Sequence, residues 1–429
     1  MKYLTCFLLI GSLFFRPVNA QEDYSFDLSE IEKKVFQFGG YLEARPVFSL
    51  LDRDSRFYFL NYYDSEQQKS ALEYNFKALL DLSYEKGIAK AQMILNADLI
   101  HTDSDWSQDT DLYEGFLSLK PSLHFHIDVG KKRLKWGKGY AWNPVAFIDN
   151  PKNPFDPDLA LEGYTVLSVD YLKSFSGKLR TLTVTGVLIP VLEGLNSQLG
   201  RHNTLNYGGK LYSLLFDTDI DLMFLAGPGI SPQYGIDFSR NITSNMEIHG
   251  EWAYWTEYSK RMVDEEGVSD QKKEDDCSYL LGIRYLTKSN TTFFLEYYRN
   301  GRGYTQKEME HYCRLIDSGY DMFLESGIED DLDLASSLTE FRAFSPAKNY
   351  LYLRIHQKEP FNIVYFDPSL TSICNLGDGS FSLVPELLYA PVTDLELRAR
   401  AMFLVGDRGT EFGEKQNNFR LELRFRYYF

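Results

Sequence analysis

The sequence has few cysteines and no long apolar run in its main part. Only 4 cysteines occur in 429 residues. Cys6 lies in the N-terminal apolar segment, and the other three, Cys277, Cys313 and Cys374, can form at most one disulfide. No later stretch offers the roughly 18 consecutive apolar residues of a transmembrane helix. A disulfide framework and helical membrane spans are therefore excluded as the organising devices of the fold.

Basic residues and tryptophan are also scarce. The chain carries 45 Lys and Arg against 61 Asp and Glu, a formal charge of −16, and this acidic balance disfavours nucleic acid as a partner. Aromatic residues are abundant all the same, with 30 Tyr and 31 Phe against 5 Trp. The mean hydropathy of −0.32 resembles that of a soluble protein. A β-barrel reconciles these values, because only alternate residues of its strands face lipid.

The N-terminus has the features of a secretory signal peptide. Lys2 precedes an apolar run over residues 4–15, and Val18-Asn19-Ala20 forms a small-residue cleavage site. Cys6 lies at the start of that run rather than after it, which argues against lipidation. We therefore predict a signal peptide over residues 1–20, a periplasmic lead over 21–35 and a barrel over 36–429. Removing Lys2 and Arg16 changes the charge from −16 to −18.

The C-terminal segment alternates apolar and charged residues up to the last position. Arg420, Glu422, Arg424 and Arg426 would share one face of a strand, and apolar residues from Phe419 to Phe429 the other. A terminal strand that is apolar outside, charged inside and closed by an aromatic residue is typical of outer-membrane barrels. We expect the assembly machinery of such barrels to recognise the strand that ends at Phe429.

Period-two segments recur along the whole chain and predict about 18 strands. The expected strands are 36–50, 70–85, 88–101, 111–120, 122–131, 161–174, 178–190, 206–216, 219–228, 231–240, 244–258, 276–287, 290–300, 348–358, 361–368, 379–390, 393–406 and 417–429. Short links alternate with long ones, except at Gly229-Ile230. The predicted fold class is an all-β, closed antiparallel transmembrane barrel with short periplasmic turns, long extracellular loops and both termini in the periplasm.

The alternation also assigns side chains to the lumen. The predicted basic wall consists of Arg45, Arg354, His356, Arg398, Arg400, Arg420, Arg424 and Arg426. The predicted acidic wall across from it consists of Glu73, Asp81, Asp98, Glu114, Asp128, Asp170, Glu247, Glu251 and Glu296. Opposed rows of charge can set the ion selectivity of a pore. The alternative is that these residues form structural ion pairs along the inner wall.

Two long loops have the composition to narrow the lumen. The loop over 132–160 is basic, aromatic and rich in proline, which favours a stiff segment folded inward as a constriction; an external lid is the alternative. The constriction residues we expect are Lys131, Arg133, Lys135, Trp136, Lys138 and Trp142. In the loop over 301–347, apolar residues from Met309 to Leu324 fall at helical spacing, which favours local packing and leaves a plug as the alternative.

Two segments carry the resemblance to a known family. The run from Val129 to Gly139, after an early strand, and the run from Phe38 to Arg45 near the start resemble bacterial outer-membrane porin-like β-barrels, including the alginate-export type. Proteins of that type are similar in strand number and act as channels for anionic polymers or small solutes. A strongly basic pore would be expected of an alginate exporter, whereas the lumen predicted for this chain has mixed charge.

Signals for catalysis or metal binding are weak. His101 with Asp98 and Asp103 is the nearest approach to a catalytic base, but acidic loops make this coincidence common. His124, His126 and Asp128 share one strand face and could meet a metal such as zinc, although cross-strand hydrogen bonding is the simpler account of them. We predict no enzyme, no metal and no cofactor.

The function predicted from the sequence is an outer-membrane channel for small polar or anionic solutes, with a charged, loop-constricted lumen. One alternative is a non-conducting envelope barrel that binds surface polysaccharide or a partner. Another is an exporter of an anionic polysaccharide. The expected partners are outer-membrane lipid and lipopolysaccharide, the barrel-assembly machinery and small polar solutes, with no nucleic acid.

Overall fold

A computed structural model describes residues 35–65, 67–102 and 105–429. The expected signal peptide and nearly all of the expected lead therefore lie outside the described residues. Eighteen strands form one sheet. They are β1 Phe36–Leu51, β2 Ser70–Lys86, β3 Ala89–His101, β4 Trp106–Leu119, β5 Phe125–Lys132, β6 Tyr164–Ser174, β7 Leu179–Val191, β8 Thr204–Leu215, β9 Thr218–Gly227, β10 Ile230–Thr243, β11 Met246–Val263, β12 Ser269–Leu286, β13 Thr291–Arg299, β14 Asn349–Gln357, β15 Phe366–Asn375, β16 Phe381–Val392, β17 Leu395–Val405 and β18 Asn417–Tyr428.

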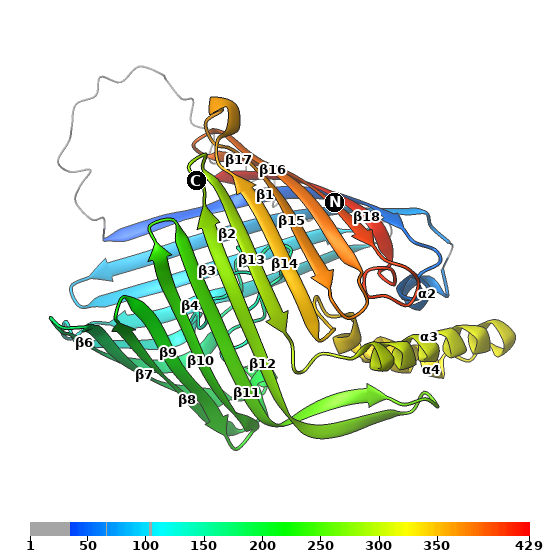
Figure 1. Ribbon diagram of the computed structural model, residues 1–429, viewed down its shortest axis with the longest axis horizontal. Coiled ribbons are helices and arrows are strands. Elements are labelled where there is room, and N and C mark those ends of the chain that lie inside the picture. The colour runs from blue at the N-terminus through cyan, green and yellow to red at the C-terminus, as the bar shows by residue number, and fades with distance from the viewer. Residues whose placement is uncertain (1–34, 66, 103–104) are drawn as a thin grey trace. The chain divides into compact units, whose positions relative to one another are not determined.

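The sheet closes on itself. Each strand pairs antiparallel with the next one in the chain, and β1 pairs with both β2 and β18 (Figure 1). The seam continues to the last residue, because Phe429 and Gly40 exchange backbone hydrogen bonds of 3.2 Å in both directions. Closure pairs the edge strands, which is the condition for a sheet to exist in hydrocarbon. The predicted closed antiparallel barrel is confirmed.

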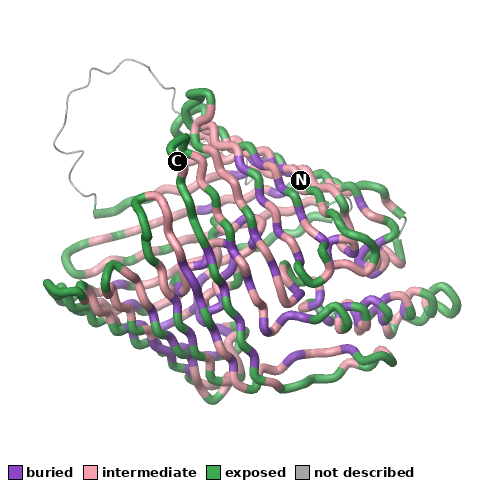
Figure 2. The backbone as a smooth tube through the Cα atoms, viewed as in Figure 1, coloured by how far each residue is buried: buried purple, intermediate pink, exposed green. Residues whose placement is uncertain are grey.

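Side chains alternate between the two faces of the barrel as the sequence predicts. In β12 the neighbours Leu280 and Leu281 are 0% and 56% exposed, and buried and exposed positions alternate along many strands (Figure 2). The exposed positions carry Leu, Phe, Tyr, Ile and Val from nearly every strand. The inner positions carry mostly polar residues that are buried by one another and by loops. This is the apolar belt and polar interior of a membrane barrel.

The predicted strand pattern differs from the structure in several places. Strand β4 begins at Trp106 rather than 111, so most of the predicted long loop over 102–110 is strand. Strand β15 runs over Phe366–Asn375 rather than 361–368, and a turn with positive φ at Glu359, Phe361 and Tyr365 precedes it. The predicted long loop over 259–275 is instead the end of a hairpin, because β11 and β12 pair as far as Val263 and Ser269. Only residues 264–268 connect these two strands.

Helices are confined to the connections between strands. Helix α2 (Arg56–Tyr62) follows β1, and α3 (Gln306–Ser326) and α4 (Asp330–Ser337) lie between β13 and β14. A capping box between Thr305 and Glu308 begins α3, and its predicted apolar stripe packs locally against α2, α4 and the end of β11 (Figure 1). No helix in the described part of the chain is long and apolar enough to cross a bilayer.

Candidate functional site

The connection between β5 and β6 crosses the interior of the barrel. We call residues 133–163 the inner loop. It contacts inward-facing side chains of β9, β11, β13, β14, β17 and β18, which lie on different sides of the barrel wall. A loop on the outside of the rim could not reach all of these strands, so these contacts favour the inward-folded loop over the external lid.

Two carboxylates of the barrel wall hold the inner loop through its backbone. Glu251 of β11 accepts hydrogen bonds from the N–H groups of Lys138 (2.5 Å), Gly139 (2.6 Å) and Val145 (3.2 Å). Both carboxylates are buried, with exposed fractions of 3% for Glu251 and 0% for Glu296. A buried carboxylate that accepts several N–H groups is a strong, directional anchor.

Glu296 of β13 makes the equivalent contact one step further along the loop. It accepts hydrogen bonds from the N–H groups of Tyr140 (2.5 Å) and Ala141 (2.9 Å), and His249 Nε2 lies 2.8 Å from it. Gly139 lies between the two anchors, where an added Cβ would meet the backbone oxygen of Trp142 at 2.0 Å. Only glycine fits this position, which fixes the path of the loop.

A third carboxylate, from the loop itself, shapes its first turn. Asp149 accepts hydrogen bonds from the N–H groups of Leu134 (3.2 Å), Lys135 (3.2 Å) and Trp136 (2.9 Å). Burial raises the pKa of Asp149, and the three N–H groups partly offset that rise. The same turn contains Lys135 in the left-handed region, with φ of 54°.

The two predicted tryptophans of the loop pack against different strands of the wall. Trp136 is 1% exposed and belongs to a cluster with Trp255 of β11. Trp142 stacks on Tyr298 at 5.1 Å between ring centroids, and its indole N–H donates to Ser345 at 2.9 Å. Both rings lie between the loop and the wall, where they exclude water and stiffen the loop.

The predicted loop cations lie along the start of the inner loop. Lys138 pairs with the buried Asp221 of β9 at 2.9 Å. Lys131 pairs with Glu162, and the backbone N–H of Arg133 donates to Glu114 at 2.8 Å. Lys135 lies beside the turn that Asp149 holds.

Arginines of the late strands gather around a carboxylate of the inner loop. Asp156 lies 2.9 Å from Arg424, 3.4 Å from Arg400 and 3.7 Å from Arg398. Glu386 of β16 also contacts Arg398 and Arg400. Burial alone would raise the pKa of Asp156, but the three guanidinium groups outweigh it and hold the pKa below its ordinary value.

The arginine cluster extends over the seam between the first and last strands. Its members are Arg354, Arg398, Arg400, Arg424 and Arg426. Arg426 pairs with Glu43 of β1 at 2.7 Å, and Arg424 lies 2.9 Å from Glu422. The cluster is therefore interleaved with carboxylates rather than purely basic.

The other predicted wall residues divide into two groups. Arg45 and Arg420 line a cavity of about 360 Å³ together with Arg400 and Arg424, whereas His356 lies 4.0 Å from Asp367. The remaining acidic residues pair with neighbours on their own part of the wall. They are Glu73 with Asn75, Asp81 with Gln92, Asp98 with Lys77, Asp128 with Lys132, Asp170 with Thr185 and Glu247 with Ser239. Their role in lining a pore stays a prediction.

Glu43, Glu386 and Asp156 are among the carboxylates of this region that were absent from the predicted walls. Glu386 and Glu43 are in phase with their inward neighbours and could have been found from the alternation. Asp156 belongs to a loop without any period, where proline residues were the only signal. Its position beside three arginines could be learned only from the structure.

The weak catalytic signal does not form a catalytic arrangement. The ring of His101 stacks on Trp106 at 4.5 Å, and its Nδ1 lies 3.2 Å from the backbone oxygen of Asp105. Asp98 pairs with Lys77 instead, and Asp103 lies outside the described residues.

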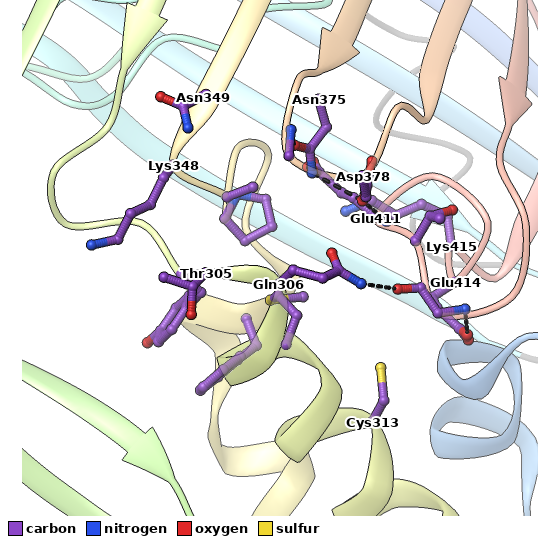
Figure 3. Close-up of a pocket in the computed structure, with 18 of the residues that line it drawn as sticks. Thr305, Gln306, Cys313, Lys348, Asn349, Asn375, Asp378, Glu411, Glu414 and Lys415 are labelled. Carbon is purple, nitrogen blue, oxygen red and sulfur yellow. Dashed lines mark hydrogen bonds between the residues drawn. The ribbon is translucent and has the colours of Figure 1, made fainter.

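A second cavity, of about 300 Å³, lies among the loops around α3. Asn375, Asp378 and Glu411 lie close together on one side of it, and Cys313 of α3 also lines it (Figure 3). Glu411 accepts hydrogen bonds from Tyr350 (2.6 Å) and Asn375 (3.0 Å) through one oxygen. Its other oxygen is buried without a hydrogen-bond partner. Burial raises the pKa of Glu411 to about 7.

This pKa predicts a pH-dependent stability of the loop over 406–416. Because the folded state holds the proton more tightly than the unfolded state, the carboxyl favours folding at low pH. The free energy of unfolding should fall by about 3 kcal/mol as the pH rises from about 4.5 to about 7. Hydrogen-exchange protection of this loop, corrected for intrinsic rates, should be higher at pH 5 than at pH 8. Glu411→Gln should remove the difference, and equal protection in the unaltered protein would contradict it.

The comparisons with known proteins find the fold and nothing more specific. No protein-family profile matches the sequence, and no curated protein matches it. Solved structures do match. The outer membrane protein OprD of Pseudomonas aeruginosa is 10% identical, with a TM-score of 0.51, and the match covers 91% of this chain and 93% of that chain. The chain has an outer-membrane β-barrel fold.

Two other structures match as completely. Pseudomonas aeruginosa OccK5 (OpdH) is 12% identical with a TM-score of 0.51, covering 91% of this chain and 97% of that one. Acinetobacter baumannii OccAB1 is 10% identical with a TM-score of 0.53, covering 92% and 97%. The TM-scores and coverages show a shared barrel architecture, and identities this low carry no information on the side chains of the interior.

Proposed function

We propose that the chain is a channel of the bacterial outer membrane that lets small polar or anionic solutes diffuse through a lumen narrowed by the inner loop. The observation that carries this proposal is the anchoring of that loop across the interior by Glu251 and Glu296. A constriction must keep its shape against passing solutes, and carboxylates that bind backbone N–H groups provide that rigidity.

Charge beside the loop supports a preference for anions. The arginine cluster places five guanidinium groups on strands β14, β17 and β18, and Arg45 and Arg420 line the neighbouring cavity. Carboxylates compensate part of this charge, so the proposed preference is moderate rather than complete. No enzymatic activity, cofactor or energy source is part of the proposal.

The apolar belt supports the proposed location and partners. Its leucine, phenylalanine and tyrosine side chains would face outer-membrane lipid and lipopolysaccharide. The strand that ends at Phe429 pairs with β1 at the seam that closes the barrel, and we propose that the assembly machinery recognises it.

Reconstitution into a planar bilayer tests the channel directly. Discrete conductance steps are expected from the purified mature protein, because a lumen that passes solutes also passes ions. Heat-denatured protein at the same concentration is the control. A bilayer that stays sealed at every voltage would contradict the proposal and favour a non-conducting barrel. Flux of an anionic polymer into liposomes would identify the polysaccharide exporter instead.

A further inference from the structure

Three side chains with metal-binding groups meet on the inner wall where β5 begins and β6 ends. They are His126 and Asp128 of β5 and Asp170 of β6. His126 and Asp170 are direct partners in the strand register. One ligand atom from each residue lies within 4.8 Å of the other two. The ligand set suggested by the sequence contained His124 in place of Asp170. In the structure His124 is exposed, and its Nδ1 lies 2.9 Å from the backbone oxygen of Leu172.

The carboxylate at the centre of this cluster has a buried oxygen that no donor satisfies. Asp128 is 2% exposed, and its Oδ1 makes no hydrogen bond although His126 Nε2 lies only 3.0 Å away. A buried acceptor without a donor is unfavourable by about 1–3 kcal/mol. A cation bound to Oδ1 would satisfy this oxygen.

Neighbouring groups orient the two carboxylates and leave one oxygen of each free for a ligand. Lys132 contacts Oδ2 of Asp128, and Thr185 donates to Oδ1 of Asp170 at 2.5 Å. Hydrogen bonds of this kind to ligating carboxylates are the usual support of a metal site. Ser118 Oγ lies 2.5 Å from His126 Nε2, and a metal on this nitrogen would replace that contact.

The set of ligands selects the class of metal. One imidazole nitrogen and two carboxylate oxygens suit Zn²⁺ and similar divalent transition metals, at about 2.0–2.2 Å from each ligand. A cavity of about 270 Å³, lined by Asp128 and Asp170, adjoins the cluster and has room for water as the fourth ligand. Lys132 and Lys210 also line this cavity, and their positive charges oppose a cation and lower its affinity.

We propose that His126, Asp128 and Asp170 form a binding site for Zn²⁺ or a related divalent metal on the inner wall. The site is independent of the proposed channel activity, because it requires only the folded barrel. It lies toward the short-turn end of β5 and β6, and the cavity beside it is also lined by Arg133, Leu134 and Trp136 of the inner loop.

Isothermal titration of the purified, detergent-solubilised protein with ZnCl₂ tests the site. The unaltered protein should bind one equivalent of metal above the level of the control titration into buffer. His126→Ala should lower the affinity at least tenfold, and His124→Ala, two residues away, should leave it unchanged. Co²⁺ in place of Zn²⁺ should give visible absorption bands of a tetrahedral N/O site that His126→Ala removes.

Folding of each variant can be verified from the heat-dependent mobility of barrels in gel electrophoresis. Asp170→Asn provides a second test if His126→Ala does not fold, because it keeps the size of the side chain and the hydrogen bond from Thr185. Equal affinity in the unaltered protein and in folded His126→Ala or Asp170→Asn would overturn the proposal. Loss of binding in His124→Ala alone would overturn it as well.

Discussion

Replacing both Glu251 and Glu296 by alanine is expected to raise the single-channel conductance several-fold. The two carboxylates accept hydrogen bonds from five backbone N–H groups of the inner loop. Each buried N–H group left without an acceptor is unfavourable by about 1–3 kcal/mol. The loop can avoid this penalty only by leaving the wall, which widens the lumen. Single-channel recording of the double variant beside the unaltered protein measures the effect.

Glu247→Ala is the matched control. Glu247 lies on the same strand as Glu251 and faces the same interior, but it contacts Ser239 and Arg284 rather than the loop. Its replacement should leave the size of the conductance steps unchanged. Unchanged steps in a folded double variant would show that the aromatic contacts alone hold the loop in place.

The second large effect is expected from the arginine cluster. Changing Arg398, Arg400 and Arg424 to glutamine removes three positive charges and leaves Asp156 and Glu386 without most of their partners. A unit charge about 8 Å from a passing ion is worth roughly 2 kcal/mol at an effective dielectric constant of about 20. We therefore expect the anion-to-cation permeability ratio to fall about tenfold, which corresponds to about 1.4 kcal/mol.

The reversal potential under a salt gradient measures this change. Arg408→Gln is the control, because Arg408 lies in the loop before β18 and its side chain is 60% exposed. It should leave the reversal potential where it is. A reversal potential that does not move in the triple variant would mean that the cluster only holds the inner loop and the seam together. Glutamine is preferred to glutamate here, since glutamate would place a like charge beside Asp156.

The sequence predicts the barrel well because lipid imposes one rule on every strand. Every outward position must be apolar, whereas the inward positions between them can be polar. The alternation of apolar and polar residues therefore recurs along the whole chain. The prediction is wrong at β15, where Ser372 and Cys374 occupy outward positions and inward positions include Ser369 and Thr371. A strand whose two faces differ little in polarity cannot be distinguished from a loop by its sequence. The apolar residues of the preceding turn resemble a strand, which moved the predicted strand toward them.

The site is less predictable than the barrel because its contacts join distant parts of the chain. Alternation places Glu251 and Glu296 inside the barrel. The groups that donate hydrogen bonds to them, however, are backbone N–H groups more than 100 residues away in the sequence. Backbone N–H groups leave no mark in a sequence, so these carboxylates could be predicted as wall residues and not as anchors. The same holds for Asp156, whose neighbours come from strands β17 and β18.

The long hairpin of β11 and β12 affects how the molecule associates with other molecules of the same protein. Strand β13 pairs with β12 only from Tyr279 onward, so the stretch over 269–276 has a paired neighbour on one side alone among the described residues. An unpaired edge can recruit a strand from another molecule and start aggregation. Six of the eight residues there are charged, namely Asp270, Lys272, Lys273, Glu274, Asp275 and Asp276. Their charges and strong hydration oppose such recruitment, so the projecting hairpin can stay solitary on a crowded cell surface.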